Sequence, residues 1–399
     1  MIEASRFVKK LNELGVDFFT GVPDSLLKSF CAYVTDMCGD SHTIAANEGG
    51  AVGLASGHYL ATGKPALVYM QNSGQGNAVN PLCSLADPDV YSIPMVLLVG
   101  WRGEPGVKDE PQHVKQGKVT ISLFETLGIP AEVLPDDESA ALELTQKMVE
   151  TANTESRPVA LIVRKGLFAE YKLQNKEADI ASVRREEAIE GVLRALPENA
   201  VVVSTTGMIS REVYETRERM GLDHSRDFLT VGSMGHAIMI ALGIAKAQPK
   251  RKVYCLDGDG ASIMHLGNMA ITGQSGCENL THIVFNNAAH DSVGGQPTVG
   301  GKIDFEKIAE ELGYNVLQSP QDQYCGNAIV GMNEIADGMK WLVSMAEQAE
   351  QIAPDGTDGL PKKPNFILFK VAKGARKDLG RPKEPPQVNK ALFMGMLGR

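Results

Sequence analysis

The sequence predicts an α/β protein made of two doubly wound parallel-sheet domains. Two observations indicate this fold class. Short apolar segments typical of buried parallel strands alternate with helical segments, and the alternation forms two series separated by a polar, aperiodic stretch. With 399 residues, 43% of them hydrophobic, the chain has ample material for buried cores. We place the first domain at residues 1–168, a linker at 169–182, and the second domain with a C-terminal tail at 183–399.

In the first series, glycine and proline mark the junctions between elements. Pro23 suits the start of a helix, and Gly63 suits the end of another. Residues 101–119 interrupt the alternation with glycines, prolines and mixed charges, so we predict a functional loop there. We expect strands at 16–20, 42–46, 66–70, 95–99, 131–134 and 159–163, and helices at 3–15, 26–34, 47–63, 79–85, 122–127 and 138–151.

The second series repeats the same alternation after the linker. The last stretch of the chain is basic and contains prolines, and we expect a wrapping tail there. We predict strands at 200–204, 228–230, 253–256, 282–285 and 366–371, and helices at 186–195, after 207, at 237–247, near 261, at 305–312 and at 328–348.

Composition restricts the partners and the location of the protein. A net charge of −10 argues against nucleic acid or an anionic membrane as the main partner. No apolar run approaches the roughly 18 residues of a membrane span, and the N-terminus reads as an amphipathic helix, so we expect a cytoplasmic protein. The 6 cysteines are scattered without a CxxC pair, which favours neither a zinc site nor a disulfide framework.

Two short polar motifs follow neighbouring strands in the second series. Asp259, between Gly258 and Gly260, comes just after the strand at 253–256, and Asn287 follows the next strand. The intervening stretch is long enough for one crossover helix, so both side chains should lie at the same edge of the sheet. Open α/β sheets bind their ligands at this edge.

This edge offers oxygen ligands and anion donors together. Mg²⁺ prefers a few protein oxygens completed by phosphate oxygens and water, so Asp259 and Asn287 suit a magnesium ion that carries a diphosphate. A helix starting near Ala261 offers free N–H groups, and Ser262 offers a hydroxyl donor. Each motif alone is also common as an ordinary turn.

At this spacing the pair of motifs resembles the signature of thiamine diphosphate enzymes, GDG followed by NN. The resemblance implies Mg²⁺ bound by Asp259, by the side chain of Asn287 and by the backbone carbonyl of Ala289. It also implies that residues 1–168 form the pyrimidine-binding domain and that the second domain binds the diphosphate. The remaining cofactor-binding residues that it implies are Glu48, Asn72, Ser73, Gly74, Thr205, Thr206, Gly207, Gly232, Met234, Gly258, Gly260, Ala261 and Ser262.

Glu48 opens a helix and matches the family's proton-relay glutamate. As a carboxylic acid it would hydrogen-bond the pyrimidine ring and favour the imino form, which removes the thiazolium proton to give the ylid; burial keeps such an acid protonated near neutral pH. The alternative from the residue alone is a helix-terminal charge stabilised by the helix dipole. By resemblance, Met234 lies under the cofactor and forces its bent shape, although a methionine early in an apolar helix is usually part of the core packing. Thr205, Thr206 and Gly207 are either diphosphate donors or ordinary caps.

The resemblance narrows to the family of phosphonopyruvate and sulfopyruvate decarboxylases, because the chain has no room for a middle domain. The matching segments are GVPDSLLK at 21–28, the loop at 71–76, SLADP at 84–88, GWRGEPGVKDEPQH at 100–113 and AHDSVGGQPT at 289–298. This family implies decarboxylation of 3-phosphonopyruvate to phosphonoacetaldehyde and CO₂ in phosphonate biosynthesis. It implies a homodimer or homotetramer with active sites between subunits, where Glu48 reaches the neighbour's cofactor.

Three alternatives stay open at this point. Sulfopyruvate decarboxylase would use the same mechanism on a sulfonate. A non-catalytic thiamine diphosphate-binding subunit is disfavoured by Glu48 occurring together with Asp259 and Asn287, since binding alone needs no proton relay. A carboligase is disfavoured by the missing middle domain.

The predicted substrate end differs from that of larger 2-oxo acid decarboxylases. There is no His-His pair and no glutamate soon after Asn287. A doubly charged phosphonate needs cations and N–H donors. Our hypothesis places Asp24 and His290 near the reacting carbons, and the substrate anion among Arg102, Lys108, His113, Lys115 and Asp291. The alternative is that the loop at 101–119 only covers the site and its lysines are solvated.

Overall fold

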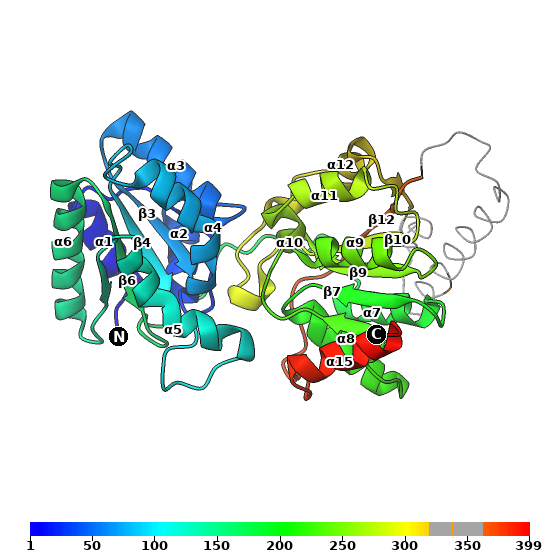
Figure 1. Ribbon diagram of the computed structural model, residues 1–399. Coiled ribbons are helices and arrows are strands. Elements are labelled where there is room, and N and C mark those ends of the chain that lie inside the picture. Colours follow the sequence, from blue (N-terminus) through cyan, green and yellow to red (C-terminus); the bar gives the residue numbers. More distant parts are fainter. Residues whose placement is uncertain (319–336, 338–361) are drawn as a thin grey trace. The chain divides into compact units, whose positions relative to one another are not determined.

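The structure is a computed structural model that describes residues 1–318, 337 and 362–399 (Figure 1). Apart from residue 337, which is helical, the predicted helix at 328–348 lies outside these residues, and so does Cys325. No helix in the described part of the chain is long and apolar enough to cross a bilayer.

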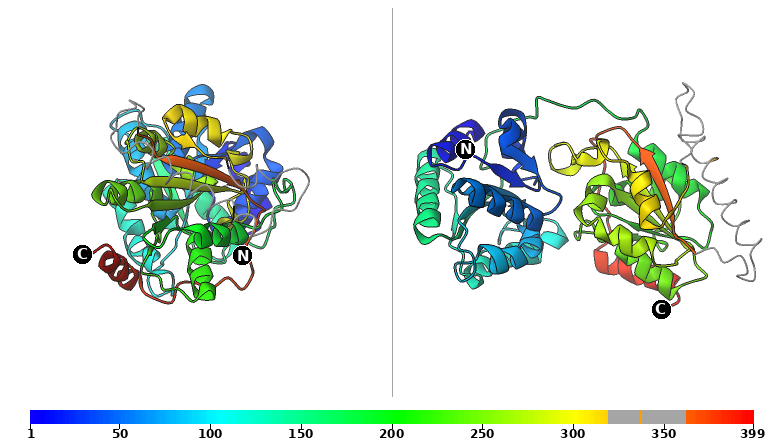
Figure 2. Two further views of the ribbon diagram at one scale, coloured as in Figure 1. Left: turned by 90° about the vertical axis from the view of Figure 1, so that its right-hand side faces the viewer. Right: turned by 90° about the horizontal axis from the view of Figure 1, so that it is seen from above.

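The chain forms two compact units. The first comprises Met1–Glu177 together with His290–Gln296, and the second comprises Ala178–Ala289 together with Pro297–Arg399. The change from the first unit to the second falls inside the predicted linker at 169–182. Each unit contains one six-stranded parallel sheet flanked by helices (Figure 2), so the predicted fold class is confirmed.

The first unit is built on a parallel sheet with the strand order β2-β1-β3-β4-β6-β5. Apolar residues on β3, β4 and β6 are fully buried because helices cover both faces. One core lies under α1, α2 and α6, and the other lies under α3, α4 and α5. The strands are β1 (Phe19–Gly21), β2 (His42–Ile44), β3 (Ala66–Gln71), β4 (Met95–Gly100), β5 (Ala131–Val133) and β6 (Pro158–Val163).

The helices of the first unit lie near the predicted positions, although α4 begins four residues before the predicted residue 79 and α6 ends four residues after the predicted residue 151. Two further features are exceptions. Gly63 ends α3 in the left-handed region at φ 70°, as predicted. Pro23 does not start a helix, because α2 begins only at Lys28. The helices are α1 (Ala4–Glu13), α2 (Lys28–Met37), α3 (Glu48–Thr62), α4 (Gln75–Pro81), α5 (Pro111–Thr126) and α6 (Glu138–Glu155), with short helical turns at Gly39–Ser41, Asn72–Gly74 and Leu82–Ala86.

The second exception is α5, which corrects the loop predicted at 101–119. Pro111 occupies the first turn of α5, so only about half of the predicted loop is irregular. The buried face of α5 consists of His113, Gly117, Thr120 and Phe124, which follow helical spacing. Because three of these four residues are small or polar, the segment lacks the apolar periodicity by which a helix is recognised in sequence.

The second unit contains a parallel sheet with the order β11-β12-β10-β9-β7-β8. The two-residue strand β11 and the helices α11 and α15 were not predicted. The strands are β7 (Val201–Ser204), β8 (Asp227–Leu229), β9 (Val253–Gly258), β10 (Leu280–Asn286), β11 (Asn315–Val316) and β12 (Asn365–Lys370). The helices are α7 (Arg185–Ala195), α8 (Met208–Met220), α9 (Ala237–Ala247), α10 (Asp259–Met264), α11 (Gly267–Gly273), α12 (Phe305–Leu312) and α15 (Pro386–Met396), with turns at Asp291–Val293 and Val299–Gly301.

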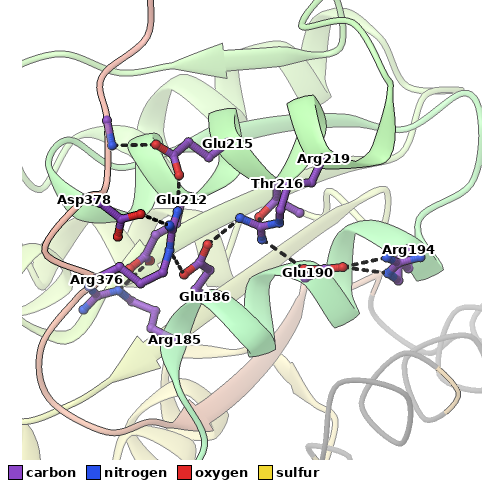
Figure 3. Close-up of polar contacts among 11 residues, drawn as sticks. Arg185, Glu186, Glu190, Arg194, Glu212, Glu215, Thr216, Arg219, Arg376 and Asp378 are labelled. Atoms are coloured by element: carbon purple, nitrogen blue, oxygen red, sulfur yellow. Dashed lines mark hydrogen bonds and ion pairs between the residues drawn. The ribbon is translucent and has the colours of Figure 1, made fainter.

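The C-terminal segment is held on the second unit by polar contacts and ends in a helix. Arg376 pairs with Glu186 of α7, with Glu215 of α8 and with Asp378 (Figure 3). In α15, the side chain of Asn389 donates to the carbonyl of Asp227 at 2.8 Å, and this hydrogen bond attaches α15 to the edge strand β8. The expected wrapping tail is therefore an ordered strap followed by a packed helix.

Candidate active site

Four loops meet at the C-terminal edge of the second sheet. The strands β10, β9, β7 and β8 are neighbours in that order, so the loops that follow them are adjacent. Ser204 pairs with Leu256 across β7 and β9, and Gly258 pairs with Phe285 across β9 and β10. The predicted residues on these loops therefore lie at one edge: Thr205, Thr206 and Gly207 after β7; Gly232 and Met234 after β8; Asp259, Gly260 and Ala261 after β9; Asn287 and Ala289 after β10.

Asp259 is the buried acid of this edge, with 3% of its surface exposed. Its carboxylate accepts hydrogen bonds from the backbone N–H groups of Gly260 and Asn287 and from the hydroxyl of Thr298. Burial nevertheless raises its pKa to about 6. The contact with Asn287 shows directly that the two motifs meet across β9 and β10.

The Asn286–Ala289 turn is fixed by its own side chains. Asn286 donates to the carbonyl of Gly300 at 2.8 Å and accepts from the N–H of Ala288 at 3.0 Å. The Asn287 side-chain oxygen accepts from the N–H of Ala289 at 3.0 Å. Ala288 holds a left-handed φ of 56°, an unusual conformation for a residue with a Cβ. The turn therefore presents side-chain and backbone oxygens in a defined arrangement.

The donor set fits a divalent cation. Asp259 is a buried carboxylate with no Lys, Arg or His partner among the residues that the structure describes. Isolated buried carboxylates are costly, and a bound cation is one way to offset that cost. The oxygens of Asp259, Asn287 and Ala289 are hard ligands of the kind that Mg²⁺ prefers.

The loops after β7 and β8 are joined by a hydrogen bond from the N–H of Gly232 to the Thr206 hydroxyl at 3.0 Å. Gly207 has a φ of 96°, and Gly232 and Ser233 have φ values of 69° and 47°. Such consecutive left-handed residues turn backbone groups outward from a strand end. Met234 is half-buried, and its carbonyl lies 3.1 Å from Nδ1 of His236.

The hydroxyl of Ser262, a predicted anion donor, donates to Asp257 at 3.2 Å. Its contact with an anion stays a prediction. The helix that carries Ser262 starts at Asp259, two residues before the predicted Ala261. Asp257 is fully buried, also accepts from the N–H of Gly258 at 2.9 Å, and lies 3.4 Å from Nε2 of His282.

Asp257 and Thr298 were not among the predicted site residues. Asp257 could have been found in the sequence as a second acid in the motif that contains Asp259. Thr298 could have been found as the last residue of the unusual segment 289–298. Gly300 was missed as well, although a Cβ there would overlap the Asp259 carboxylate. The sequence does not indicate a site role for His282, because its contact with Asp257 depends on the pairing of β9 with β10.

In the first unit, Glu48 begins α3 and is buried, with 5% of its surface exposed. Its carboxyl accepts from Nδ2 of Asn77 at 2.7 Å. Burial raises the pKa of Glu48 more than that hydrogen bond lowers it. A Cβ on Gly74 would overlap the Glu48 carboxyl, so the glycine leaves the space that the acid occupies. The predicted loop at 71–76, called the small-residue loop below, therefore packs against Glu48 itself.

Asn72 is fully buried and uses its side chain inside the protein. It donates to the carbonyl of Arg102 at 2.7 Å and to the hydroxyl of Thr120 at 2.9 Å. Its side-chain oxygen accepts from the N–H of Arg102 at 3.2 Å. Ser73 is exposed and donates to Gln71 at 2.8 Å. Asn72 thus holds the loop after β3 against the loop after β4, and its predicted contact with a cofactor stays a prediction.

Asp24 is fully buried at the end of β1. It accepts from Nε2 of Gln71 at 2.6 Å and from the N–H of Leu26 at 2.9 Å. Burial raises the pKa of Asp24. Hydrogen bonds and the positive charge of Arg102 lower this pKa and offset part of the effect of burial. Gly100 belongs to this arrangement, because a Cβ there would overlap the Asp24 carboxyl.

Arg102 is not a free cation. Its Nε donates to Asp109 at 2.8 Å, its Nη2 contacts the other Asp109 oxygen at 2.5 Å, and its Nη1 donates to Ser25 at 2.9 Å. The Asp109 carboxyl loses some hydration, but the guanidinium and two backbone N–H groups hold its pKa far below the usual range. The partner, only seven residues away, was not predicted.

The other predicted substrate residues divide into two groups. Lys108 lines a cavity together with Arg102, whereas His113 and Lys115 do not line it. His113 is buried on α5, and Lys115 is exposed on the same helix. The second group, His290 and Asp291, lies on the segment that follows β10. His290 is half-buried, and loss of hydration lowers its pKa to about 4. Asp291 begins a helical turn.

Comparison with known proteins identifies the class. Residues 3–123 match the thiamine pyrophosphate (thiamine diphosphate) enzyme N-terminal TPP binding domain, and residues 205–333 match the C-terminal TPP binding domain. Phosphonopyruvate decarboxylases from Streptomyces hygroscopicus and Streptomyces viridochromogenes are each 32% identical over 401 residues, which cover 97% of this chain and 92% of the relative. A sulfopyruvate decarboxylase from Methanosarcina acetivorans is 26% identical over 331 residues, covering 77% of this chain and 82% of the relative.

The chain is therefore a thiamine diphosphate-dependent decarboxylase. Within that class, it belongs to the family that contains the phosphonopyruvate decarboxylases. Its cofactor is thiamine diphosphate.

Gly74→Ala tests the contact between the small-residue loop and Glu48. The predicted role of Glu48 is the proton relay, so we expect turnover to fall on the order of a hundredfold, because a misplacement of about 1 Å in an active site can cost that much. The φ of Gly74 is −73°, so alanine is strained by contact and not by backbone conformation. Gly76→Ala is the matched control, since a Cβ there meets nothing within 4 Å. Steady-state kinetics check both variants; equal rates for the two would contradict the contact.

Proposed function

We propose that the protein decarboxylates 3-phosphonopyruvate to phosphonoacetaldehyde and CO₂ and serves phosphonate biosynthesis. The choice of 3-phosphonopyruvate as the substrate is supported by the similarity to two phosphonopyruvate decarboxylases over 97% of the chain. The buried Glu48 carboxyl with its raised pKa supports catalysis over cofactor binding alone. When bound, thiamine diphosphate supplies the nucleophile and the electron sink for decarboxylation of a 2-oxo acid.

Glu48 is the proposed proton-relay acid. Its raised pKa favours the protonated carboxyl, and this proton can be shared with a ring nitrogen of the cofactor. Asn77 holds one carboxyl oxygen, which orients the other toward its partner. Gly74 keeps space for the group. The buried Asp24 and the half-buried His290 are proposed to act near the reacting carbons, Asp24 as an acid with a raised pKa and His290 as a neutral imidazole.

Asp259, the Asn287 side chain and the Ala289 carbonyl are proposed to hold Mg²⁺. The lack of a cationic side chain beside Asp259 in the described part of the chain supports this assignment. The backbone of the loops at Thr205, Thr206 and Gly207 and at Gly258, Gly260 and Ala261 is proposed to bind the diphosphate, and the loop at Gly232 and Met234 the pyrimidine ring. Asn72, Ser73 and Gly74 are proposed to border the cofactor from the first unit. We also propose a homodimer or homotetramer, which light scattering with size-exclusion chromatography can test.

One assay tests the proposal. Aldehyde release is measured with 3-phosphonopyruvate, sulfopyruvate and pyruvate, each with and without thiamine diphosphate and Mg²⁺. We expect turnover of 3-phosphonopyruvate that requires both additions and a much lower kcat/KM for pyruvate. Turnover of none of the three would reject the proposal.

A second candidate is sulfopyruvate decarboxylation, which the relative from Methanosarcina acetivorans favours. Phosphonate and sulfonate are tetrahedral anions of similar size and differ mainly in charge. A higher kcat/KM for sulfopyruvate than for 3-phosphonopyruvate in the same assay would select this candidate.

A further inference from the structure

A cavity of about 240 Å³ opens at the C-terminal edge of the first sheet. It is several times larger than the roughly 30 Å³ that one water molecule occupies in the liquid. The cavity is bordered by the loops that follow β1, β4 and β6. The lining residues that matter here are Ser25, Arg102, Glu104, Lys108, Asp109 and Lys165.

Hydrogen bonds hold the three loops together. The N–H of Trp101 donates to the carbonyl of Val163 at 2.9 Å, which joins the ends of β4 and β6. Nη1 of Arg102 donates to the hydroxyl of Ser25 at 2.9 Å, which joins the loop after β4 to the loop after β1. The shape of the cavity is therefore set by contacts within the first unit.

Both acids in the lining are neutralised by arginines. Asp109 binds Arg102 at 2.8 Å, and both side chains are less than one-fifth exposed. Glu104 binds Nε of Arg164 at 3.0 Å. Since each acid is paired with one cation, these four charges cancel.

Two cations in the lining have no such partner. Lys108 and Lys165 make no ion pair with any carboxylate in the residues that the structure describes. Lys165 lies two residues after the end of β6, and Lys108 belongs to the loop after β4. The cavity consequently carries two uncompensated positive charges, which match a dianion better than a monoanion.

We propose that Lys165, together with Lys108, is a specificity-determining residue that binds the doubly charged phosphonate end of the substrate. Arg102 positions the loop after β4 through its contacts with Asp109 and Ser25, and its guanidinium forms a polar part of the cavity wall. This inference rests on the proposed function and extends it, because two positive charges would favour a phosphonate over a sulfonate of similar shape. A sulfonate carries one negative charge, and the methyl group of pyruvate carries none.

Binding of two small probes tests the charge preference without turnover. Calorimetric titration of the protein, loaded with thiamine diphosphate and Mg²⁺, compares methylphosphonate with methanesulfonate at a pH where methylphosphonate is a dianion. We expect Lys165→Ala to weaken methylphosphonate binding roughly three- to tenfold, and the double variant with Lys108→Ala more than about tenfold. Methanesulfonate should change less, and Lys165→Arg should restore binding. Lys118→Ala, at an exposed lysine of α5 outside the lining, is the matched control.

Kinetics supply the second readout. In Lys165→Ala we expect KM for 3-phosphonopyruvate to rise by a similar factor while KM for pyruvate and kcat stay within about twofold. Equal effects of Lys165→Ala and Lys118→Ala would overturn the inference. So would an equal loss of affinity for the dianion and the monoanion.

The two proposals fail in different ways. If the wild-type protein turns over 3-phosphonopyruvate but Lys165→Ala behaves as the wild type, only the inference about Lys165 fails. If the wild-type protein turns over no phosphonate but binds methylphosphonate through Lys165, the proposed function fails and the dianion site stands.

Discussion

Glu48→Gln is expected to reduce decarboxylation by about 10²- to 10⁴-fold, the range for loss of a general acid or base. Glutamine keeps the size of the side chain and its contact with Asn77, but it cannot supply the proton. The measurement is the exchange rate of the C2 proton of the bound cofactor, followed by NMR after acid quench. An undiminished exchange rate would remove Glu48 from the mechanism.

The control separates loss of chemistry from loss of binding. Affinity for thiamine diphosphate, measured by calorimetry, should change only a few-fold in Glu48→Gln, because the residues proposed to bind the diphosphate and the metal lie in the second unit. Glu125→Gln, at an exposed position of α5, should match the wild-type protein in both measurements.

The pH dependence of the wild-type protein gives the same residue a second readout. The protonated acid is the proposed active form, and burial raises its pKa. Activity should therefore persist below the raised pKa and fall as the pH rises through it. This alkaline limb should be missing from the residual activity of Glu48→Gln.

Asp259→Asn is expected to weaken Mg²⁺ binding by about a hundredfold or more. Changes to residues that only support a metal ligand already cost about 10- to 100-fold, and Asp259 is proposed to bind the ion directly. The measurement is activity as a function of Mg²⁺ concentration after treatment with a chelator. A Mg²⁺ requirement equal to that of the wild-type protein would exclude Asp259 as a ligand.

Thermal melting tests the same assignment without turnover. Without metal, the buried Asp259 carboxylate destabilises the fold above its raised pKa of about 6, so Asp259→Asn should melt at the same temperature as the wild type or higher. Addition of thiamine diphosphate and Mg²⁺ should stabilise the wild type and leave the variant nearly unchanged. Asp40→Asn, at an exposed turn of the first unit, should respond as the wild type does.

Much of the fold was predictable because its signals are local. Buried parallel strands are continuous apolar runs, and β3, β4 and β6 fit that pattern. Helix α5 has no such local signal. Its buried face includes His113, Gly117 and Thr120, so no apolar stripe marks it, and the helix is recognisable only once those residues are seen packed against the sheet.

The juxtaposition of Asp259 and Asn287 also followed from the sequence, because parallel strands end at the same edge of a sheet. The hydrogen bond from the N–H of Asn287 to the Asp259 carboxylate agrees with that expectation. Thr298 completes the arrangement, but its contact closes a loop whose path no local pattern specifies.

The state of individual charges was decided by the tertiary structure. Arg102 reads in the sequence as a free cation beside Lys108, yet it is neutralised by Asp109, while Lys165 becomes a free cation of the same cavity. The sequence by itself determined the fold class, the order of elements and the cofactor motif, since these depend on periodicity and spacing. Only the tertiary structure decided which acids are buried and which cations are free, because burial and pairing arise where segments distant in sequence meet at a sheet edge.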